Sequence, residues 1–181
     1  MRVIAGERKG TRLTAPVGLR VRPTLDRVRE SLFNILGPRV ENARFLDLFA
    51  GTGANGIEAL SRGAAECTFV DNHPRSLACI RRNLELTHLS EHAALQRLVL
   101  PQGIATLARS GIGYDIIFAD PPYDFAQYDV LLAQIRDCSL AAPSGLLVLE
   151  HAVQAERFPG ATNLQCFRRA EYGDTALSFF S

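Results

Sequence analysis

Hydrophobic positions change their spacing repeatedly along the chain from about residue 44 onward. Short apolar runs alternate with segments in which apolar residues recur every three or four positions, which is typical of strands and helices alternating in a parallel α/β sheet. The pattern predicts strands over residues 44–49, 66–70, 93–100, 114–119 and 145–149, and helices around 56–60, over 73–88 and over 128–140.

The C-terminal end departs from this alternation. Two strand-like runs, over 163–168 and 175–180, are joined by a short polar segment, which predicts an antiparallel hairpin. The hairpin brings the predicted total to seven strands. We therefore expect a mostly parallel sheet that ends in an antiparallel pair.

The N-terminal end contains turns and an amphipathic helix. Residues 1–23 carry several glycines and prolines, and a helical apolar face follows over 24–36. Neither internal repeats nor long linkers are visible. We expect a single domain over 1–181, in which 1–43 form a basic arm and helix and 44–181 form the core.

Composition narrows the class of protein. The chain has 181 residues, of which 47% are hydrophobic and 22% are charged, so a disordered or collagen-like chain is excluded. Its four cysteines are spaced too widely for a zinc knuckle or a secreted disulfide framework. Neither a signal-peptide core nor a membrane-length apolar run is present, so we expect a cytoplasmic protein.

Positive charge is concentrated at the N-terminus. Residues 1–44 hold 10 Lys and Arg against 4 Asp and Glu, whereas the remaining residues hold 10 against 15. Lys9 is the only lysine, so nearly all of this charge is guanidinium, which binds phosphate in a bidentate manner. The asymmetry is typical of an arm that meets a polyanion, although a solvated basic face is the commoner origin of such a cluster.

A glycine loop indicates a nucleotide site. The segment Gly51-Thr52-Gly53-Ala54-Asn55-Gly56 follows a predicted strand and opens a helix. Asp71 falls 20 residues after Gly51, at the end of the next strand, where an acid can bind ribose hydroxyls. This spacing alone also fits a dinucleotide cofactor.

Asp47 bears on which cofactor the loop binds. It lies four residues before the first glycine, at the end of the strand. A carboxylate there repels a pyrophosphate but attracts a cofactor that carries an ammonium and a sulfonium. The loop therefore fits S-adenosylmethionine better than NAD.

The segment Asp120-Pro121-Pro122-Tyr123 indicates an acceptor site. It follows a buried strand, so it lies at the sheet edge where open α/β folds bind ligands. The Asp120 carboxylate and the rigidly held carbonyl of Pro121 can orient the two N–H bonds of an exocyclic base amine, and Tyr123 can stack on a flipped base. A proline-stiffened turn is the alternative interpretation.

The sequence lacks the residues that two other kinds of chemistry require. Pyrimidine C5 methylation needs a cysteine nucleophile, and none of the four cysteines lies in a proline-flanked loop at the sheet edge. The four histidines make no helical face with a carboxylate, so we predict no metal site.

Several motifs together resemble one family. Arg22-Pro23-Thr24, Asp47-Leu48-Phe49-Ala50-Gly51, Glu58-Ala59-Leu60-Ser61-Arg62-Gly63, Asp120-Pro121-Pro122-Tyr123 and Tyr172-Gly173-Asp174 are similar to those of the bacterial RsmD-like family, which methylates N2 of a guanine in 16S ribosomal RNA. The resemblance covers almost the whole chain. It implies a class I Rossmann-like methyltransferase that uses S-adenosylmethionine and modifies guanine 966 of 16S rRNA.

The resemblance also implies which residues act. Asp120, Pro121, Pro122 and Tyr123 would form the catalytic base site. The cofactor residues would be Asp47, Ala50, Gly51, Gly53, Gly56, Asp71, Asn72 and Gln102, and the RNA residues Arg20, Arg22, Pro23, Thr24, Arg29 and Tyr172, extended by Arg168 and Arg169. The expected partner is 16S rRNA, naked or in the assembled small subunit. No membrane partner is expected, and a monomer is the simplest assembly.

The chain departs from the family at one point, which keeps alternatives open. After the third strand the family carries an acid near the cofactor adenine, whereas Leu98 to Gly103 contain none, and Gln102 can substitute only as an amide. A non-catalytic RNA-binding protein that retains the fold is therefore one alternative. The others are a DNA adenine-N6 methyltransferase, which this short chain gives no extra domain to support, and an NAD-dependent oxidoreductase, which Asp47 opposes.

Overall fold

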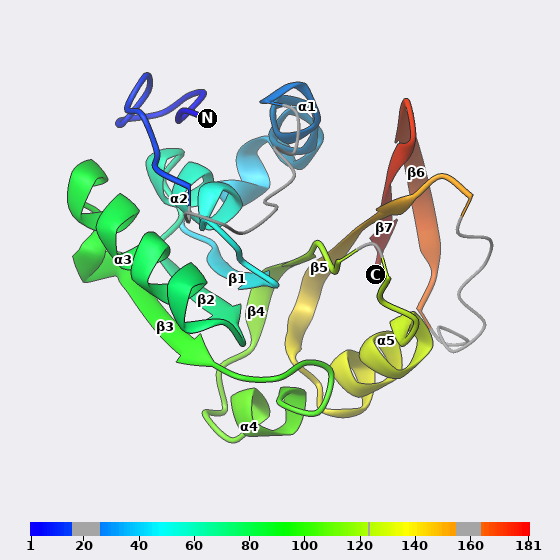
Figure 1. Cartoon of the computed structure of the whole chain (residues 1–181). Helices are drawn as coiled ribbons and strands as arrows, with labels where there is room; N and C mark the ends of the chain where they lie inside the picture. Colours follow the sequence, from blue (N-terminus) through cyan, green and yellow to red (C-terminus); the bar gives the residue numbers. More distant parts are fainter. Residues whose placement is uncertain (16–25, 123, 155–163) are drawn as a thin grey trace. The chain divides into compact units, whose positions relative to one another are not determined.

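A computed structural model describes residues 1–15, 26–122, 124–154 and 164–181. The chain divides into two compact units, Met1–Arg97 and Leu98–Ser181. We describe each unit by itself. Figure 1 labels the helices and strands.

The first unit is built on three parallel strands in the order β3-β2-β1. Helix α2 packs on β1 and β2, and α3 packs on β2 and β3 (Figure 1). The strands are β1 (Arg44–Leu48), β2 (Glu66–Asp71) and β3 (Ala93–Arg97); the helices are α1 (Asp26–Leu36), α2 (Ala54–Ser61) and α3 (Pro74–Thr87), with short 3-10 turns η1 (Gly37–Val40) and η2 (Ser90–His92).

The core of the first unit explains why the apolar residues of β1 do not alternate with polar ones. Phe45 is fully buried and its ring stacks on Phe33 of α1, with 6.2 Å between the ring centroids. Strands covered on both faces carry apolar residues at successive positions rather than alternate ones. Helix α3 begins where the His73 side chain accepts the N–H of Arg75 at 3.1 Å, and it ends at Thr87, after which His88 adopts the left-handed conformation.

The N-terminal arm, residues 1–14, folds back on itself and belongs to this unit. The N–H of Val3 donates to the carbonyl of Thr11, and the N–H of Leu13 donates to that of Met1. The side chains of Val3 and Leu13 are buried, so the arm contributes apolar surface to the core. Its charged residues are therefore carried on a packed segment.

The Glu58 carboxylate of α2 fastens this arm. It accepts the backbone N–H of Ile4 at 2.7 Å and that of Ala5 at 3.0 Å, and it pairs with Arg62 at 2.7 Å. Glu58 has no exposed surface. A buried carboxylate that accepts several charged or backbone donors is a strong anchor, because each bond is charge-assisted.

The second unit contains four strands in the order β4-β5-β7-β6. Strands β4 and β5 are parallel, whereas β7 pairs antiparallel with both β5 and β6. The elements are α4 (Ile104–Ala108), β4 (Tyr114–Ala119), α5 (Tyr128–Asp137), β5 (Ala141–Ala152), β6 (Cys166–Tyr172) and β7 (Thr175–Phe180). Every residue of β7 is buried, because it is the inner strand of the hairpin.

Most predicted elements are confirmed, although several bounds differ. Strand β3 ends at Arg97 rather than 100, α5 ends at Asp137 rather than 140, β5 spans Ala141–Ala152 rather than 145–149, and β6 spans Cys166–Tyr172 rather than 163–168. Helix α4 is not predicted by the apolar pattern, and the described part of α1 begins at Asp26, the first described residue after position 25. Thr24, the predicted N-cap of that helix, lies outside the described residues. In the part of the chain that the structure describes, no helix is long and apolar enough to cross a bilayer.

Candidate cofactor and base-binding residues

The glycine loop joins the end of β1 to the start of α2. Gly51 and Gly53 have φ angles of +56° and +76°, so the loop needs two left-handed residues that only glycine adopts without strain. The N–H of Gly53 donates to the carbonyl of Ala50 at 2.7 Å and closes the turn. The loop is therefore a tight turn that presents backbone, as the sequence predicts.

Asp47 has a structural task that sequence reasoning missed. Its side chain is 1% exposed, and one carboxylate oxygen accepts the N–H of Gly56 at 2.9 Å, within the first turn of α2. The residue at the helix N-cap is Gly53, which has no side chain to do this. Asp47 therefore caps α2 from the preceding strand while keeping negative charge beneath the loop.

Gly56 lets α2 approach β2 closely. A Cβ atom at this position would lie 2.3 Å from the ring of Phe69 and 2.5 Å from the sulfur of Cys67. Burial, followed by the nearby Asp47 and Glu66 charges, raises the pKa of the Cys67 thiol well above its usual value. Gly56 is thus required for packing, and Cys67 beneath it stays protonated.

Asp71 fastens the loop from the end of β2. One of its carboxylate oxygens accepts the N–H of Gly51 at 2.9 Å, and the other accepts that of His73 at 2.8 Å. A carboxylate offers about four acceptor positions, so these two bonds leave capacity for further hydroxyl donors. Asp71 is partly exposed, which suits a ribose contact, and its neighbour Asn72 is exposed.

The loop backbone at Gly51 is open to the close approach of a ligand. A Cβ atom added at Gly51 would meet nothing closer than the carbonyl of Phe49 at 3.9 Å. Backbone approach, a ribose-type acid at Asp71 and a buried negative charge at Asp47 are the features that such a cofactor uses. The residues of the first unit therefore fit the predicted group, with Ala50 buried at the base of the turn.

The predicted base-binding segment belongs to the second unit. Asp120 directly follows the buried end of β4 and is partly exposed. After the two prolines the chain turns, because the N–H of Phe125 donates to the carbonyl of Pro122 at 2.9 Å. Phe125 then packs edge-on against Tyr128, with ring centroids 5.3 Å apart. Tyr123 lies outside the described residues.

Gln102 also belongs to the second unit. It lies in the turn before α4, and its side chain is exposed. Behind it Gly103 is buried, and a Cβ atom there would lie 2.7 Å from that of Leu98. The turn is therefore closely packed below an exposed amide.

The structure describes some of the residues predicted to bind RNA, and these differ in their exposure. Arg29 is 1% exposed; its guanidinium donates to Asp26 and to the carbonyl of Arg2, both at 2.8 Å. The structure thus corrects the expectation that Arg29 faces RNA, because a buried guanidinium that holds the arm cannot also be presented to phosphate. Tyr172 is partly exposed at the end of β6. Arg20, Arg22, Pro23 and Thr24 lie outside the described residues.

Arg168 and Arg169 are exposed on β6. Arg169 donates to the carbonyl of Val153 at 2.6 Å and pairs with Glu171 at 3.2 Å. Its charge is therefore partly engaged within the unit. Such an edge position is also typical of arginines that only protect a sheet from pairing.

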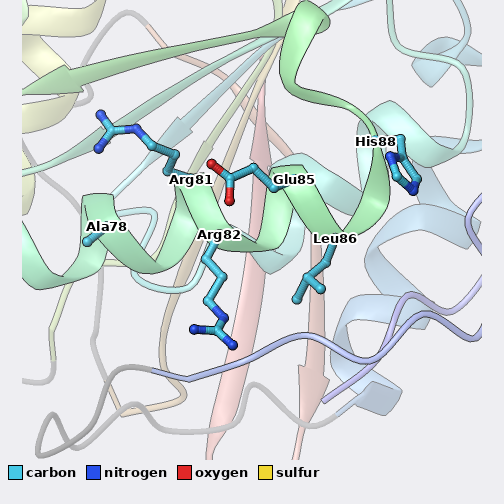
Figure 2. A pocket seen from close by; sticks show the side chains of 6 residues that line it. All are labelled: Ala78, Arg81, Arg82, Glu85, Leu86 and His88. Atoms are coloured by element: carbon cyan, nitrogen blue, oxygen red, sulfur yellow. The ribbon is translucent and has the colours of Figure 1, made fainter.

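A shallow hollow lies on the outer side of α3. Figure 2 shows its lining, in which Arg81 and Glu85 extend to one side of the helix and Arg82 and Leu86 to the other. None of the predicted site residues lines it. In the described part of the chain there is also no cluster of three or more His, Cys, Asp or Glu that could hold a metal ion.

Comparison with known proteins relates the whole chain to one family. The family model described as "Conserved hypothetical protein 95" matches residues 1–181. The chain is 38% identical over 180 residues to YlbH of Bacillus subtilis (strain 168), covering 99% of this chain and 98% of that protein. It is 35% identical over 154 residues to Ribosomal RNA small subunit methyltransferase D of Escherichia coli (strain K12), covering 85% and 76%.

Solved structures of similar proteins have the same fold as this chain. YhhF from Escherichia coli matches with a TM-score of 0.86 and 33% identity, over 99% of this chain and 96% of that chain. SMU.776 complexed with SAH matches with a TM-score of 0.69 over 86% and 48%, but at 20% identity this likeness shows the fold alone. The predicted α/β methyltransferase fold, with mostly parallel strands and an antiparallel C-terminal pair, is confirmed. The chain therefore belongs to the Conserved hypothetical protein 95 family, the family of ribosomal RNA small subunit methyltransferase D.

Proposed function

We propose that this protein transfers a methyl group from S-adenosylmethionine to the exocyclic N2 of a guanine in 16S ribosomal RNA, guanine 966 in that RNA's numbering. The observation that carries the proposal is Asp120 at the carboxyl end of β4, followed at once by two prolines. Support also comes from its relative in Escherichia coli, named a ribosomal RNA small subunit methyltransferase.

The cofactor is held by the first unit. S-adenosylmethionine supplies an electrophilic methyl group on a positively charged sulfur. Asp71 has the acceptor capacity for the ribose hydroxyls, and the Gly51 turn leaves room for close approach. The buried Asp47 carboxylate favours the cofactor's positive charge and disfavours a pyrophosphate, which supports this cofactor over NAD.

Asp120 prepares the nitrogen. The lone pair of a guanine N2 is delocalised into the ring, so the amine is a poor nucleophile. A carboxylate that accepts one N–H bond orients the amine and then takes the proton that the nitrogen loses once it is methylated. The rigid Pro121 carbonyl serves as the second acceptor, and Tyr123 provides a stacking face for the flipped base.

The RNA contacts come from the N-terminal segment and β6. Arg20, Arg22, Pro23 and Thr24 supply charge and shape beside the target base, and Tyr172 extends the surface. Guanidinium groups bind the phosphates, and the flipped guanine carries the specificity. The protein acts as a monomer in the cytoplasm, where its ribosomal substrate is.

Transfer of labelled methyl groups tests the proposal. Undermethylated small subunits, naked 16S rRNA and duplex DNA are each incubated with labelled S-adenosylmethionine and wild-type protein, Asp120→Ala or Asp124→Ala, followed by nucleoside analysis. Asp124 is an exposed carboxylate four residues further on, so its loss is a matched control.

We expect N2-methylguanosine from the wild-type protein and from Asp124→Ala, and a loss of at least about 100-fold with Asp120→Ala, as for removal of a general base. Whichever of the two RNA samples takes up label shows whether the substrate is naked rRNA or the assembled subunit. Label in DNA adenine contradicts the proposal, and so does RNA binding without methylation by the wild-type protein.

A further inference from the structure

Asn83 lies on the inner face of α3 and has no exposed surface. Its amide oxygen accepts the backbone N–H of Thr14 at 2.8 Å and the Thr14 hydroxyl at 2.9 Å. Its amide nitrogen donates to the carbonyl of Thr14 at 3.0 Å and to the carbonyl of Thr52 at 2.9 Å. All four hydrogen-bonding positions of the side chain are therefore used, three of them on the arm and one on the glycine loop.

Thr52 is the loop residue whose backbone this hydrogen bond fixes. It lies between Gly51 and Gly53, and glycine neighbours give the backbone more conformational freedom than other residues do. Its own side chain is 4% exposed, and the hydroxyl donates to the sulfur of Met1 at 3.6 Å. The carbonyl and the hydroxyl of Thr52 thus depend on the arm or on the side chain that the arm binds.

The arm end of this connection leads to the proposed RNA residues. Thr14 precedes the segment with Arg20 and Arg22 in the chain. Among the described residues its hydrogen bonds are made with α3: besides the bonds to Asn83, its carbonyl accepts the thiol of Cys79 at 3.3 Å. No bond joins Thr14 to the glycine loop directly in the described part of the chain.

We propose that Asn83 is a positioning residue that couples Thr14, at the end of the N-terminal arm, to the glycine loop, so that RNA bound by the segment that follows Thr14 and cofactor held by the loop strengthen each other's binding. This inference rests on the proposed function. Asn83 orders the Thr52 carbonyl only while Thr14 fixes the amide in place. Anything that orders Thr14 therefore orders the loop, and by linkage cofactor binding favours the anchored Thr14 to the same extent.

A second arm anchor offers a matched control. The Ser61 hydroxyl donates to the carbonyl of Ala5 at 2.7 Å and accepts the N–H of Arg8 at 3.0 Å. Ser61 thus holds the arm on α2 and makes no bond to Asn83 or Thr52. Ser61→Ala weakens the arm without acting through the amide, whereas Thr14→Val removes one arm bond to the amide and leaves the loop untouched.

The test compares Asn83→Asp, Thr14→Val and Ser61→Ala with the wild-type protein. Calorimetry measures the Kd of S-adenosylmethionine with and without 16S rRNA, and native-state hydrogen exchange measures protection of the Gly53 N–H, which bonds to Ala50 across the loop. Chemical unfolding measures the stability of each variant. Steady-state kinetics separates KM for the cofactor from kcat.

Asn83→Asp keeps the acceptor oxygen for Thr14 but loses the donors to the carbonyls of Thr14 and Thr52. We expect its Kd and KM for the cofactor to rise about tenfold, since one net hydrogen bond is worth roughly a factor of ten, with little change in kcat. Thr14→Val should raise the Kd about threefold and reduce the factor by which RNA tightens cofactor binding. Ser61→Ala should leave Kd, RNA factor and Gly53 exchange unchanged.

Two results would overturn the coupling. One is an unchanged cofactor Kd and Gly53 exchange in both Asn83→Asp and Thr14→Val; the other is an equal effect of Ser61→Ala, which would mean that arm stability alone matters. If Asn83→Asp fails to fold, Thr14→Val decides. If the wild-type protein binds no cofactor, the proposed function fails, and hydrogen exchange at Gly53 still decides whether arm and loop are tied.

Discussion

Replacing Glu58 by alanine should release the N-terminal arm and cost the first unit much of its stability. The carboxylate holds two arm amides and Arg62, and the oxygen that accepts the Ile4 N–H also lies 3.9 Å from the guanidinium of Arg29. Glu58 and Arg29 are each about 1% exposed on their side chains. The substitution therefore leaves one buried cation with less compensation and two backbone donors without an acceptor.

The magnitude follows from what remains. Breaking a buried ion pair by removing one partner costs about 3–5 kcal/mol. Arg29 keeps Asp26 and the carbonyl of Arg2, and a released arm can hydrate its own amides, so we expect the lower end, about 3 kcal/mol. Because a typical domain has only about 5–15 kcal/mol in total, this is a large loss.

Urea unfolding and limited proteolysis measure the two consequences. With an m-value near 2 kcal/mol/M, the expected loss lowers the midpoint by about 1.5 M, and protease should cut within residues 1–14 under native conditions. Glu85→Ala is the control, since Glu85 is exposed on α3 and should change stability by less than about 0.5 kcal/mol. If Glu58→Ala also changed the free energy of unfolding by less than about 0.5 kcal/mol and the arm stayed protected from protease, the anchoring role would be refuted.

Two further substitutions test packing and protonation. Gly56→Ala should destabilise by about 1–3 kcal/mol in urea unfolding, because its Cβ would lie 2.3 Å from the Phe69 ring; an unchanged midpoint would mean that α2 can shift away from β2. Burial lowers the pKa of His151, outweighing its bond to the carbonyl of Ala152, and its other ring nitrogen bonds Ser178 at 2.8 Å. Below the ordinary value of 6.5 the unfolded chain takes up a proton that the folded chain does not, so stability should fall as the pH drops from about 6.5 and level off below the folded pKa. His151→Gln should flatten that part of the stability profile, and an unchanged slope would exclude His151 as its origin.

The strands were predictable wherever burial on both faces placed apolar residues at successive positions, as at 45–46 of β1 and 116–119 of β4. The start of β5 was not, since its first residues are largely exposed and include Pro143, and its register against β4 shifts between Tyr114 and Ile116. Helix α4 spans only five residues, which is too short for a helical period to emerge. The single-domain expectation stays a prediction.

The motifs of the candidate site could be predicted from the sequence, but the structural roles of some of its residues could not. Spacing alone placed Asp71 at the loop, and the structure brings it to Gly51. The capping of α2 by Asp47 depends on a bond across nine residues and on the missing side chain of Gly53, which no local pattern reveals. The role of Asn83 could not be predicted for a similar reason, because an asparagine in a helical sequence does not indicate which backbone groups its side chain will bond.

The burial of Arg29 did leave a signal. Arg29, Leu32, Phe33 and Leu36 fall at the spacing of one helical face, and all four are buried in α1. The charge count over residues 1–44 treated this arginine as surface, whereas its spacing from the three apolar residues indicates the core side. A cation on an apolar face indicates a buried partner before it indicates a polyanion.

This burial changes how the basic arm should be tested. Residues 1–14 supply the partners of Glu58, Ser61 and Asn83, so deleting them exposes three polar groups of the first unit along with removing charge. A truncated protein that lost RNA methylation would therefore not distinguish lost RNA contacts from a disordered cofactor loop. Charge substitutions within the segment that follows Thr14, such as Arg20→Glu and Arg22→Glu, leave those partners in place. Weakened RNA binding at an unchanged cofactor Kd without RNA would then be assigned to phosphate contacts alone.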